Sequence, residues 1–220
     1  LVGSEMCIRD SAECSGLFVV EREGVDALNA VNEAVTLSTI LPLTAVTPGQ
    51  LIATVKIITF GVTSETIRSS IAAIGSSIVR IAPFQSLVTG LIQTRLPGTK
   101  ESVLDKTVET TQARLESLGL KLDREIRCLH NVVEVPAALK SLSESGCDIT
   151  LVLGASAIVD RRDVVPSAVE QSNGTIEHFG MPVDPGNLML LAQCEQMRVL
   201  GLPGSARSPR LLGFDWVLQR

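Results

Sequence analysis

The pattern of apolar and polar positions is most regular from residue 87 onward, where short apolar runs alternate with longer amphipathic segments. Strands interleaved with helices are typical of βαβ units, whose right-handed crossovers place helices on both faces of a sheet. The pattern therefore predicts a three-layer αβα fold of the α/β class with a mostly parallel sheet. Strands are expected over residues 87–94, 120–127, 148–153, 175–181, 188–192 and 198–202, and helices over residues 101–118, 135–145 and 163–171.

The pattern before residue 85 is less regular and predicts a smaller, partial α+β segment. A helix is expected over residues 24–39, where apolar residues recur at helical spacing. A turn at residues 47–49 and a β-branched strand over residues 51–60 follow. Thr63 is expected to cap a helix over residues 66–75, and residues 77–82 form a short strand.

These patterns divide the chain into four parts. Residues 1–10 resemble a non-native leader, so the fold prediction begins after them. Residues 11–84 form a partial N-terminal or linking module, and residues 85–210 form the α/β domain. Residues 211–220 are interpreted as the start of a truncated C-terminal continuation, with a helix that begins after Pro209.

The composition excludes several functional classes. A net charge of −5 disfavours general binding to nucleic acid or to acidic membranes, and an aromatic content of 3% disfavours a base-stacking surface. Five irregularly spaced cysteines and two histidines do not form a zinc motif. We expect these cysteines to be reduced and mostly buried, which is typical of the cytoplasm. No apolar run has the length of a membrane span.

A first candidate loop follows the apolar strand at residues 148–153. Gly154, Ala155 and Ser156 are small enough to let a ligand approach the backbone, and the next helix begins with free amides that attract an anion. Asp160 and Asp163 precede that helix and offer the oxygen ligands that Mg²⁺ prefers. The alternative is that Asp163 only caps the helix while the neighbouring arginines are solvated.

A second candidate loop contains Asp184, Pro185 and Gly186. Prolines and a glycine make this turn rigid, and Asp184 is a candidate for orienting a ligand or a metal. An ordinary turn remains the alternative.

A third candidate loop contains Pro203, Gly204 and Ser205, followed by Arg207. Turn amides and a forked guanidinium suit a phosphate, although a βα loop with a serine cap has the same pattern. In parallel sheets, ligands bind outside the carboxyl ends of strands, so we expect residues 94–100, 154–163 and 203–210 to lie together.

We interpret His130 and His178 as structural, and Ser156 as a weak candidate nucleophile because no GxSxG motif surrounds it.

Taken together, the three loops resemble the domain shared by molybdopterin adenylyltransferase, molybdopterin molybdotransferase and gephyrin. In that family, a strand runs into a glycine-rich loop with an Asp, then come a Pro-Gly turn and a strand that ends in Gly-Leu-Pro-Gly. The resemblance covers approximately residues 85–209. The matching residues are Gly154, Ala155 and Ser156 with Asp160 and Asp163, then Asp184, Pro185 and Gly186, and finally Gly201, Leu202, Pro203, Gly204 and Ser205.

The resemblance implies that the domain binds molybdopterin, an anionic pterin, in molybdenum cofactor biosynthesis. The pterin phosphate would lie over residues 154–156 and 203–205, Arg207 would hold an anion, and Asp160 or Asp163 would coordinate Mg²⁺. The resemblance also implies a homo-oligomer. The similarity is greatest to bacterial proteins in which such a domain precedes a nucleotidyltransferase domain resembling molybdenum cofactor cytidylyltransferase.

The chain departs from the family pattern at two glycine positions, which are occupied by Ala155 and Ile158. Three functions remain open. The domain transfers an adenylyl or molybdate group with Mg²⁺, it holds the pterin without catalysis for a fused or partner nucleotidyltransferase, or it is a general nucleotide-binding scaffold.

Overall fold

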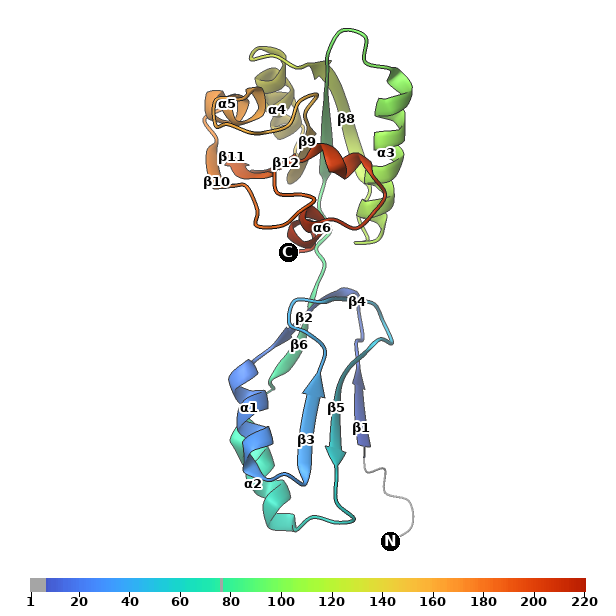
Figure 1. Cartoon of the computed structure of the whole chain (residues 1–220), viewed down its shortest axis with the longest axis vertical. Helices are drawn as coiled ribbons and strands as arrows, with labels where there is room; N and C mark the ends of the chain where they lie inside the picture. Colours follow the sequence, from blue (N-terminus) through green and yellow to red (C-terminus); the bar gives the residue numbers. More distant parts are fainter. Residues whose placement is uncertain (1–6, 76) are drawn as a thin grey trace. The chain divides into compact units, whose positions relative to one another are not determined.

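The structure is a computed structural model that describes residues 7–75 and 77–220. The chain divides into two compact units, Leu1–Phe84 with Gln219–Arg220 and Gln85–Leu218 (Figure 1). Among the helices of the described ranges, none combines the length and the apolar character of a membrane span.

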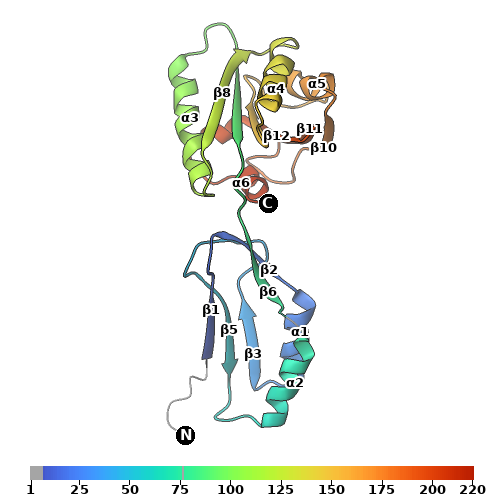
Figure 2. The same cartoon turned by 180° about the vertical axis from the view of Figure 1, so that it is seen from behind.

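Within residues 7–75 and 77–84, the first unit forms two small antiparallel sheets and two helices (Figure 2). Its elements are β1 (Cys7–Ser11), β2 (Gly16–Val20), α1 (Arg22–Val31), β3 (Val35–Thr39), β4 (Ala45–Val46), β5 (Leu51–Ile57), α2 (Ser64–Ile74) and β6 (Val79–Pro83). One sheet has the order β1-β5-β3, and the other has the order β4-β2-β6. The predicted α+β character of this segment is therefore confirmed.

The predicted cap of the second helix is also confirmed. The Thr63 hydroxyl accepts a hydrogen bond from the Thr66 amide at 3.1 Å, so one of the free donors at the start of α2 is satisfied. Leu28 of α1 and Val35 and Leu37 of β3 belong to one apolar cluster, which holds helix and sheet together.

The prediction of one helix over residues 24–39 is wrong. The helix ends at Val31, and Val35–Thr39 forms strand β3. The Asn29 side chain binds the backbone of Leu37 in both directions, accepting from its amide at 2.7 Å and donating to its carbonyl at 2.9 Å. These two hydrogen bonds hold Val35–Thr39 beside α1, and the same residues pair with β5 on the other side.

The N-terminal boundary of the fold also differs from the prediction. Residues 1–6 of the predicted leader lie outside the described residues, whereas Cys7–Ser11 pairs antiparallel with β5. The backbone groups of residues 7–10 therefore take part in a sheet of the first unit.

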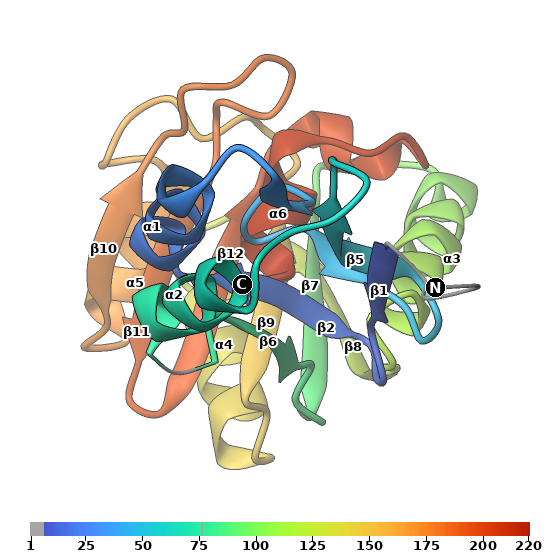
Figure 3. The same cartoon turned by 90° about the horizontal axis from the view of Figure 1, so that it is seen from below.

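The second unit contains one six-stranded sheet, in the order β10-β11-β12-β9-β7-β8 (Figure 3). The pairs β12–β9, β9–β7 and β7–β8 are parallel, and the pairs β10–β11 and β11–β12 are antiparallel. The predicted mostly parallel sheet is therefore confirmed. The elements of this unit are β7 (Thr89–Arg95), α3 (Glu101–Glu116), β8 (Leu122–Leu129), α4 (Glu134–Glu144), β9 (Ile149–Leu153), α5 (Val164–Gln171), β10 (Thr175–Phe179), β11 (Leu190–Cys194), β12 (Met197–Leu202), η1 (Gly204–Arg207) and α6 (Gly213–Leu218).

Helices cover both faces of this sheet, as a strand buried on both sides requires. Ile92 and Val152 point into the cluster formed with α4 and α5, whereas their neighbours Leu91 and Leu151 point into the cluster formed with α3 and α6. Figures 1 and 2 show α3 on the opposite side of β8 from α4 and α5. The three-layer αβα architecture is confirmed.

The final helix differs from its prediction in position and in role. It begins at Gly213 rather than directly after Pro209, and the short helix η1 precedes it. Phe214 is 1% exposed and belongs to the same apolar cluster as Leu91. Leu212 and Phe214, within the stretch interpreted as the start of a C-terminal continuation, are thus part of the core of the second unit.

All five cysteines are free. Cys128, Cys147 and Cys194 are buried, and Cys7 and Cys14 are half-buried, so the prediction of reduced and mostly buried cysteines is confirmed. Burial raises the pKa of the Cys128 thiol to about 11, which makes it a poor nucleophile near neutral pH.

Candidate functional site

The parallel pairing of β7, β9 and β12 brings the loops that follow them to one edge of the sheet. Leu153, at the end of β9, lies opposite Gln93 of β7 on one side and opposite Leu202 of β12 on the other. Leu190, at the start of β11, lies opposite Gly201, so the loop between β10 and β11 begins at the same edge. All three candidate loops therefore start at the edge that the sequence predicted.

A chain of hydrogen bonds connects the ends of β7, β8 and β9. The buried Thr94 hydroxyl accepts from the Ala155 amide at 2.7 Å and lies 2.7 Å from Nδ1 of His130. Nε2 of His130 lies 2.9 Å from the hydroxyl of Ser156, which is exposed. Burial lowers the pKa of His130, and the nearby Asp163 carboxylate opposes this shift in part. The imidazole is therefore neutral at neutral pH.

Gly154 lets the loop after β9 turn tightly. A Cβ atom at this position would lie 2.6 Å from the Ser156 carbonyl oxygen, which is closer than a side chain tolerates. The amides of Ser156 and Ala157 donate to no other group in the described ranges. They are available to an anion.

One departure from the family pattern has a packing consequence. Ile158 is buried, and a Cβ atom on Gly201 would lie 2.7 Å from its Cδ1 atom. The side chain of Ile158 therefore packs directly onto the end of β12.

Arg207 connects the third loop to the first. Its Nη1 donates to the Thr107 hydroxyl at 2.9 Å and to Oε1 of Gln93 at 3.5 Å, and its Nη2 donates to the Gly154 carbonyl at 3.4 Å. Burial lowers the pKa of Arg207, although a guanidinium remains protonated at neutral pH. Within the described chain, no carboxylate forms an ion pair with Arg207. The partners of this half-buried cation among the described residues are neutral groups.

The Pro-Gly-Ser turn forms the short helix η1 beside Arg207. The first hydrogen bond of this turn runs from the Ala206 amide to the Pro203 carbonyl at 2.9 Å. The amides of Gly204 and Ser205 precede that bond, so they lie in the free-donor positions of a helix start.

The two predicted acidic ligands lie in one loop, and each already has a partner. Oδ2 of Asp163 accepts from the amides of Val159 at 2.7 Å and Asp160 at 2.9 Å, and Asp163 makes no side-chain cap bond to α5. Asp163 is the N-cap residue of α5, as the alternative expected, but its side chain binds amides of its own loop instead of the first amides of the helix. Oδ1 of Asp160 accepts from the amide and Nε of Arg162, and these bonds lower the pKa of Asp160.

The second candidate loop has different neighbours. Asp184 and Pro185 are exposed, whereas Gly186 is buried against Gly213 at the start of α6. Among the contacts of the described residues, none joins Asp184 to Ser156 or Arg207. The structure thus brings the first and third loops into direct contact and places the second against α6.

Gln93 and Thr107 were not predicted from the sequence to belong to the site, Thr94 was predicted only as part of the range 94–100, and His130 was interpreted as structural. The position of Thr94 and His130 at the carboxyl ends of two strands was the available signal, since ligands bind outside such ends. Arg95 and Lys100, which flank the loop after β7, do not join this group; Arg95 pairs with Glu101 at 2.8 Å.

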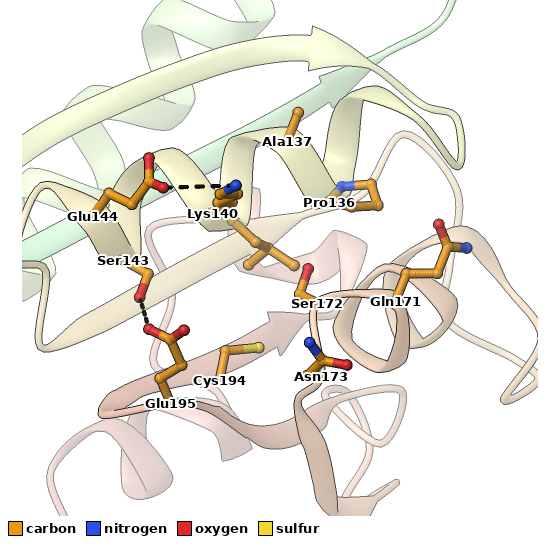
Figure 4. Close-up of a pocket in the computed structure, with 11 residues that line it drawn as sticks. Pro136, Ala137, Lys140, Ser143, Glu144, Gln171, Ser172, Asn173, Cys194 and Glu195 are labelled. Carbon is orange, nitrogen blue, oxygen red and sulfur yellow. Dashed lines mark hydrogen bonds and ion pairs between the residues drawn. The ribbon is translucent and has the colours of Figure 1, made fainter.

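A hollow of about 450 Å³ lies elsewhere, between α4, the end of α5 and the turn after β11 (Figure 4). Cys194 and Glu195 line it, and Cys194 pairs with Met197 at the start of β12. Because β12 starts there and ends at the candidate loops, this hollow lies at the opposite edge of the sheet.

Comparisons with known proteins matched solved structures alone; no family model and no curated protein matches the chain. A molybdopterin biosynthesis MoeA protein from Pyrococcus horikoshii is similar over 88% of this chain, with 13% identity and a TM-score of 0.40; the chain spans 63% of its length. The molybdopterin biosynthesis enzyme MoaB from Thermus thermophilus is similar over 60% of this chain and 89% of its own, with 17% identity and a TM-score of 0.46. A molybdopterin biosynthesis Mog protein from Mycobacterium ulcerans is similar over 61% of this chain and 91% of its own, with 13% identity and a TM-score of 0.39.

Proposed function

We propose that the second unit binds molybdopterin in molybdenum cofactor biosynthesis and holds the pterin phosphate beside Arg207. The environment of Arg207 carries this proposal. A half-buried guanidinium without a carboxylate partner in the described chain has lost hydration that no counter-charge replaces. A phosphate at this edge supplies the missing negative charge and accepts from a forked donor.

The groups around Arg207 favour a phosphate over a carboxylate as the bound anion. The guanidinium donates to the Gly154 carbonyl, so it lies beside the loop that exposes the Ser156 and Ala157 amides. The Gly204 and Ser205 amides begin the turn that carries Arg207. Donors from two loops suit a tetrahedral oxyanion. Among phosphorylated ligands, the pterin is favoured by the resemblance of the loop residues to the molybdopterin-binding family.

The two aspartates fit Mg²⁺ only in combination with the ligand. The described residues include no group of three or more His, Cys, Asp or Glu side chains that is placed to hold a metal. Mg²⁺ commonly binds through one or two carboxylates together with substrate phosphates. Asp160 and Asp163 would hold it through their remaining oxygens, and the ion would neutralise phosphate charge.

Two observations support holding rather than transfer as the role of this domain. Asp160 is engaged by Arg162, whose positive charge competes with a cation for the same carboxylate. Ile158 packs against the end of β12 at a position where the family has glycine. A holding domain would present the pterin to a fused or partner nucleotidyltransferase, and a homo-oligomer is compatible with that role.

Separate titrations of the full chain with molybdopterin and with ATP test the proposal. Replacing Arg207 by Gln removes a charged donor pair, which is expected to weaken molybdopterin binding about 10- to 100-fold. Arg210→Gln is the matched control, because Arg210 is exposed in the same segment and should leave the affinity unchanged.

Three results would contradict parts of this proposal. Binding of ATP with indifference to molybdopterin would favour a general nucleotide-binding scaffold. Magnesium-dependent nucleotide turnover would show transfer chemistry instead of holding alone. Equal effects of the Arg207 and Arg210 substitutions on molybdopterin affinity would show that Arg207 does not form the anion site.

A further inference from the structure

The buried hydroxyl of Thr94 determines where the proton of the neutral His130 ring lies. This hydroxyl accepts a hydrogen bond from the Ala155 amide at 2.7 Å, so its own hydrogen needs an acceptor. Among the described residues, the other polar atom bonded to it is Nδ1 of His130, at 2.7 Å. A buried hydroxyl rarely leaves its hydrogen unpaired. Thr94 therefore donates to Nδ1.

This assignment also determines the protonation of Nε2, the other ring nitrogen of His130. A neutral imidazole that accepts at Nδ1 carries its hydrogen on Nε2. Nε2 lies 2.9 Å from the Ser156 hydroxyl and so donates to it. The opposite tautomer would make Thr94 accept two hydrogen bonds and would leave its own hydrogen without an acceptor in a site that is 1% exposed.

We propose that the chain from Thr94 through His130 to Ser156 makes the Ser156 hydroxyl an outward-facing hydrogen-bond donor to a phosphate oxygen. Because His130 occupies a lone pair of Ser156 Oγ, the serine hydrogen is directed elsewhere. Ser156 is exposed at the edge where Arg207 contacts Gly154, so its hydrogen is available to an anion bound there. His130 acts as a positioning residue. Ser156 favours anions whose oxygen atoms can accept a hydrogen bond.

The same assignment of the His130 hydrogen argues against Ser156 as a nucleophile. A nucleophilic serine donates its hydrogen to a histidine nitrogen that acts as a base. Here Nε2 already carries a hydrogen and cannot accept one. Ser156 therefore contributes to binding and specificity rather than to covalent chemistry.

The first experiment measures the tautomer without any ligand. Nitrogen chemical shifts of the His130 ring, measured at pH 8 in the full chain, are expected to show a protonated Nε2 and an unprotonated Nδ1. Thr94→Val removes the hydroxyl and should mix the two tautomers, while Thr94→Ser keeps the hydroxyl and should restore the wild-type signature. A protonated Nδ1 in the wild-type chain would overturn the inference.

The second experiment measures binding of inorganic phosphate by NMR titration. Ser156→Ala is expected to weaken binding about tenfold, since it removes one hydrogen bond to a charged acceptor. His130→Leu should weaken binding by a similar factor, and His130→Gln, which retains a side-chain amide donor, should recover part of it. The double variant Ser156→Ala with His130→Leu should be no weaker than either single variant, because both changes remove the same donor.

The binding experiment also separates this inference from the proposed function on which it rests. Binding that depends on Arg207 but not on Ser156 or His130 would overturn the donor role and leave the anion site intact. Additive effects of the two single variants would equally overturn the coupling. Absence of phosphate binding in the wild-type chain would contradict both the anion site and the donor role, whereas the ring signature would still decide the tautomer.

Discussion

Arg114 of α3 and Asp215 of α6 form a buried ion pair, with Nε 2.9 Å from Oδ1 and side chains 12% and 7% exposed. Arg114 also donates to the carbonyls of Ala206, Ser208 and Arg210, and it stacks on the Phe214 ring. Asp215 in turn accepts from the Leu212 amide at 2.6 Å. One guanidinium thus holds the whole segment that carries Arg207 against α3.

We therefore expect Arg114→Ala to destabilise the second unit by about 3–5 kcal/mol, because the substitution leaves the Asp215 carboxylate buried without its partner. The third loop should also lose its position, so binding of phosphate should weaken together with stability. Urea unfolding followed by the fluorescence of Trp216 in α6 measures the first effect. Lys140→Ala is the control, since Lys140 pairs with Glu144 at 3.7 Å on the surface and should cost less than about 0.5 kcal/mol. Equal losses in the two variants would contradict this role of Arg114.

The sheet of the second unit was predictable because each strand and helix there is identified by its own local pattern. Val35–Thr39 was not, because Val31, Ala34 and Val35 continue the helical spacing of the preceding segment, and the strand depends on pairing with β5. β1 and β2 were also missed, since they pair with β5 and β6, which lie far away in the sequence. Local periodicity carries no information about such distant partners.

The same distinction applies to the site. The loops at residues 154–156 and 203–205 were visible as small residues after apolar strands. The contact between Thr94 and His130 was not visible, because these residues are 36 positions apart and meet only through the parallel pairing of β7 and β8. Arg207 was predicted from the sequence to bind an anion, but its burial among neutral groups required the fold.

The pKa of His130 predicts how stability changes with pH. Burial lowers this pKa below the value of about 6.5 that is typical of an unfolded chain. As the pH falls through 6.5, the unfolded chain binds a proton before the folded chain does, so the free energy of unfolding decreases. The decrease should continue until the pH reaches the folded-state pKa.

Urea unfolding between pH 8 and pH 5 measures this dependence as the difference between wild type and His130→Gln. His130→Gln should lack the part of the pH dependence of the free energy of unfolding that His130 contributes. His178→Gln, which changes an exposed histidine, should keep that part. A wild-type stability that rises as the pH falls relative to His130→Gln would have the wrong sign and would refute the buried neutral ring.

The tight turn at Gly154 predicts a sharp contrast between two glycines of the site. Gly154→Ala would place a Cβ atom 2.6 Å from the Ser156 carbonyl oxygen, and this backbone atom must shift. We expect a loss of about 1–3 kcal/mol of stability and weaker phosphate binding, because Ser156 moves away from His130. Gly204→Ala has open space around its Cβ position and should change stability by less than about 0.5 kcal/mol. Thermal unfolding and phosphate titration of both variants would test this, and similar behaviour of the two would refute the turn argument.

The placement of the two aspartates predicts that Mg²⁺ binding requires the ligand. Each carboxylate has one oxygen engaged within its own loop, and the described residues include no group of three His, Cys, Asp or Glu side chains that is placed to hold a metal. Mg²⁺ gives up its water reluctantly and needs several oxygen ligands, so a phosphate must complete its coordination. Calorimetric titration with MgCl₂ should therefore show binding only when molybdopterin is present. Asp160→Asn or Asp163→Asn should remove this dependence, and Glu170→Gln, an exposed acid on α5, should not. Tight Mg²⁺ binding without the pterin would mean that the protein alone supplies the ligands, contrary to this arrangement of the loop.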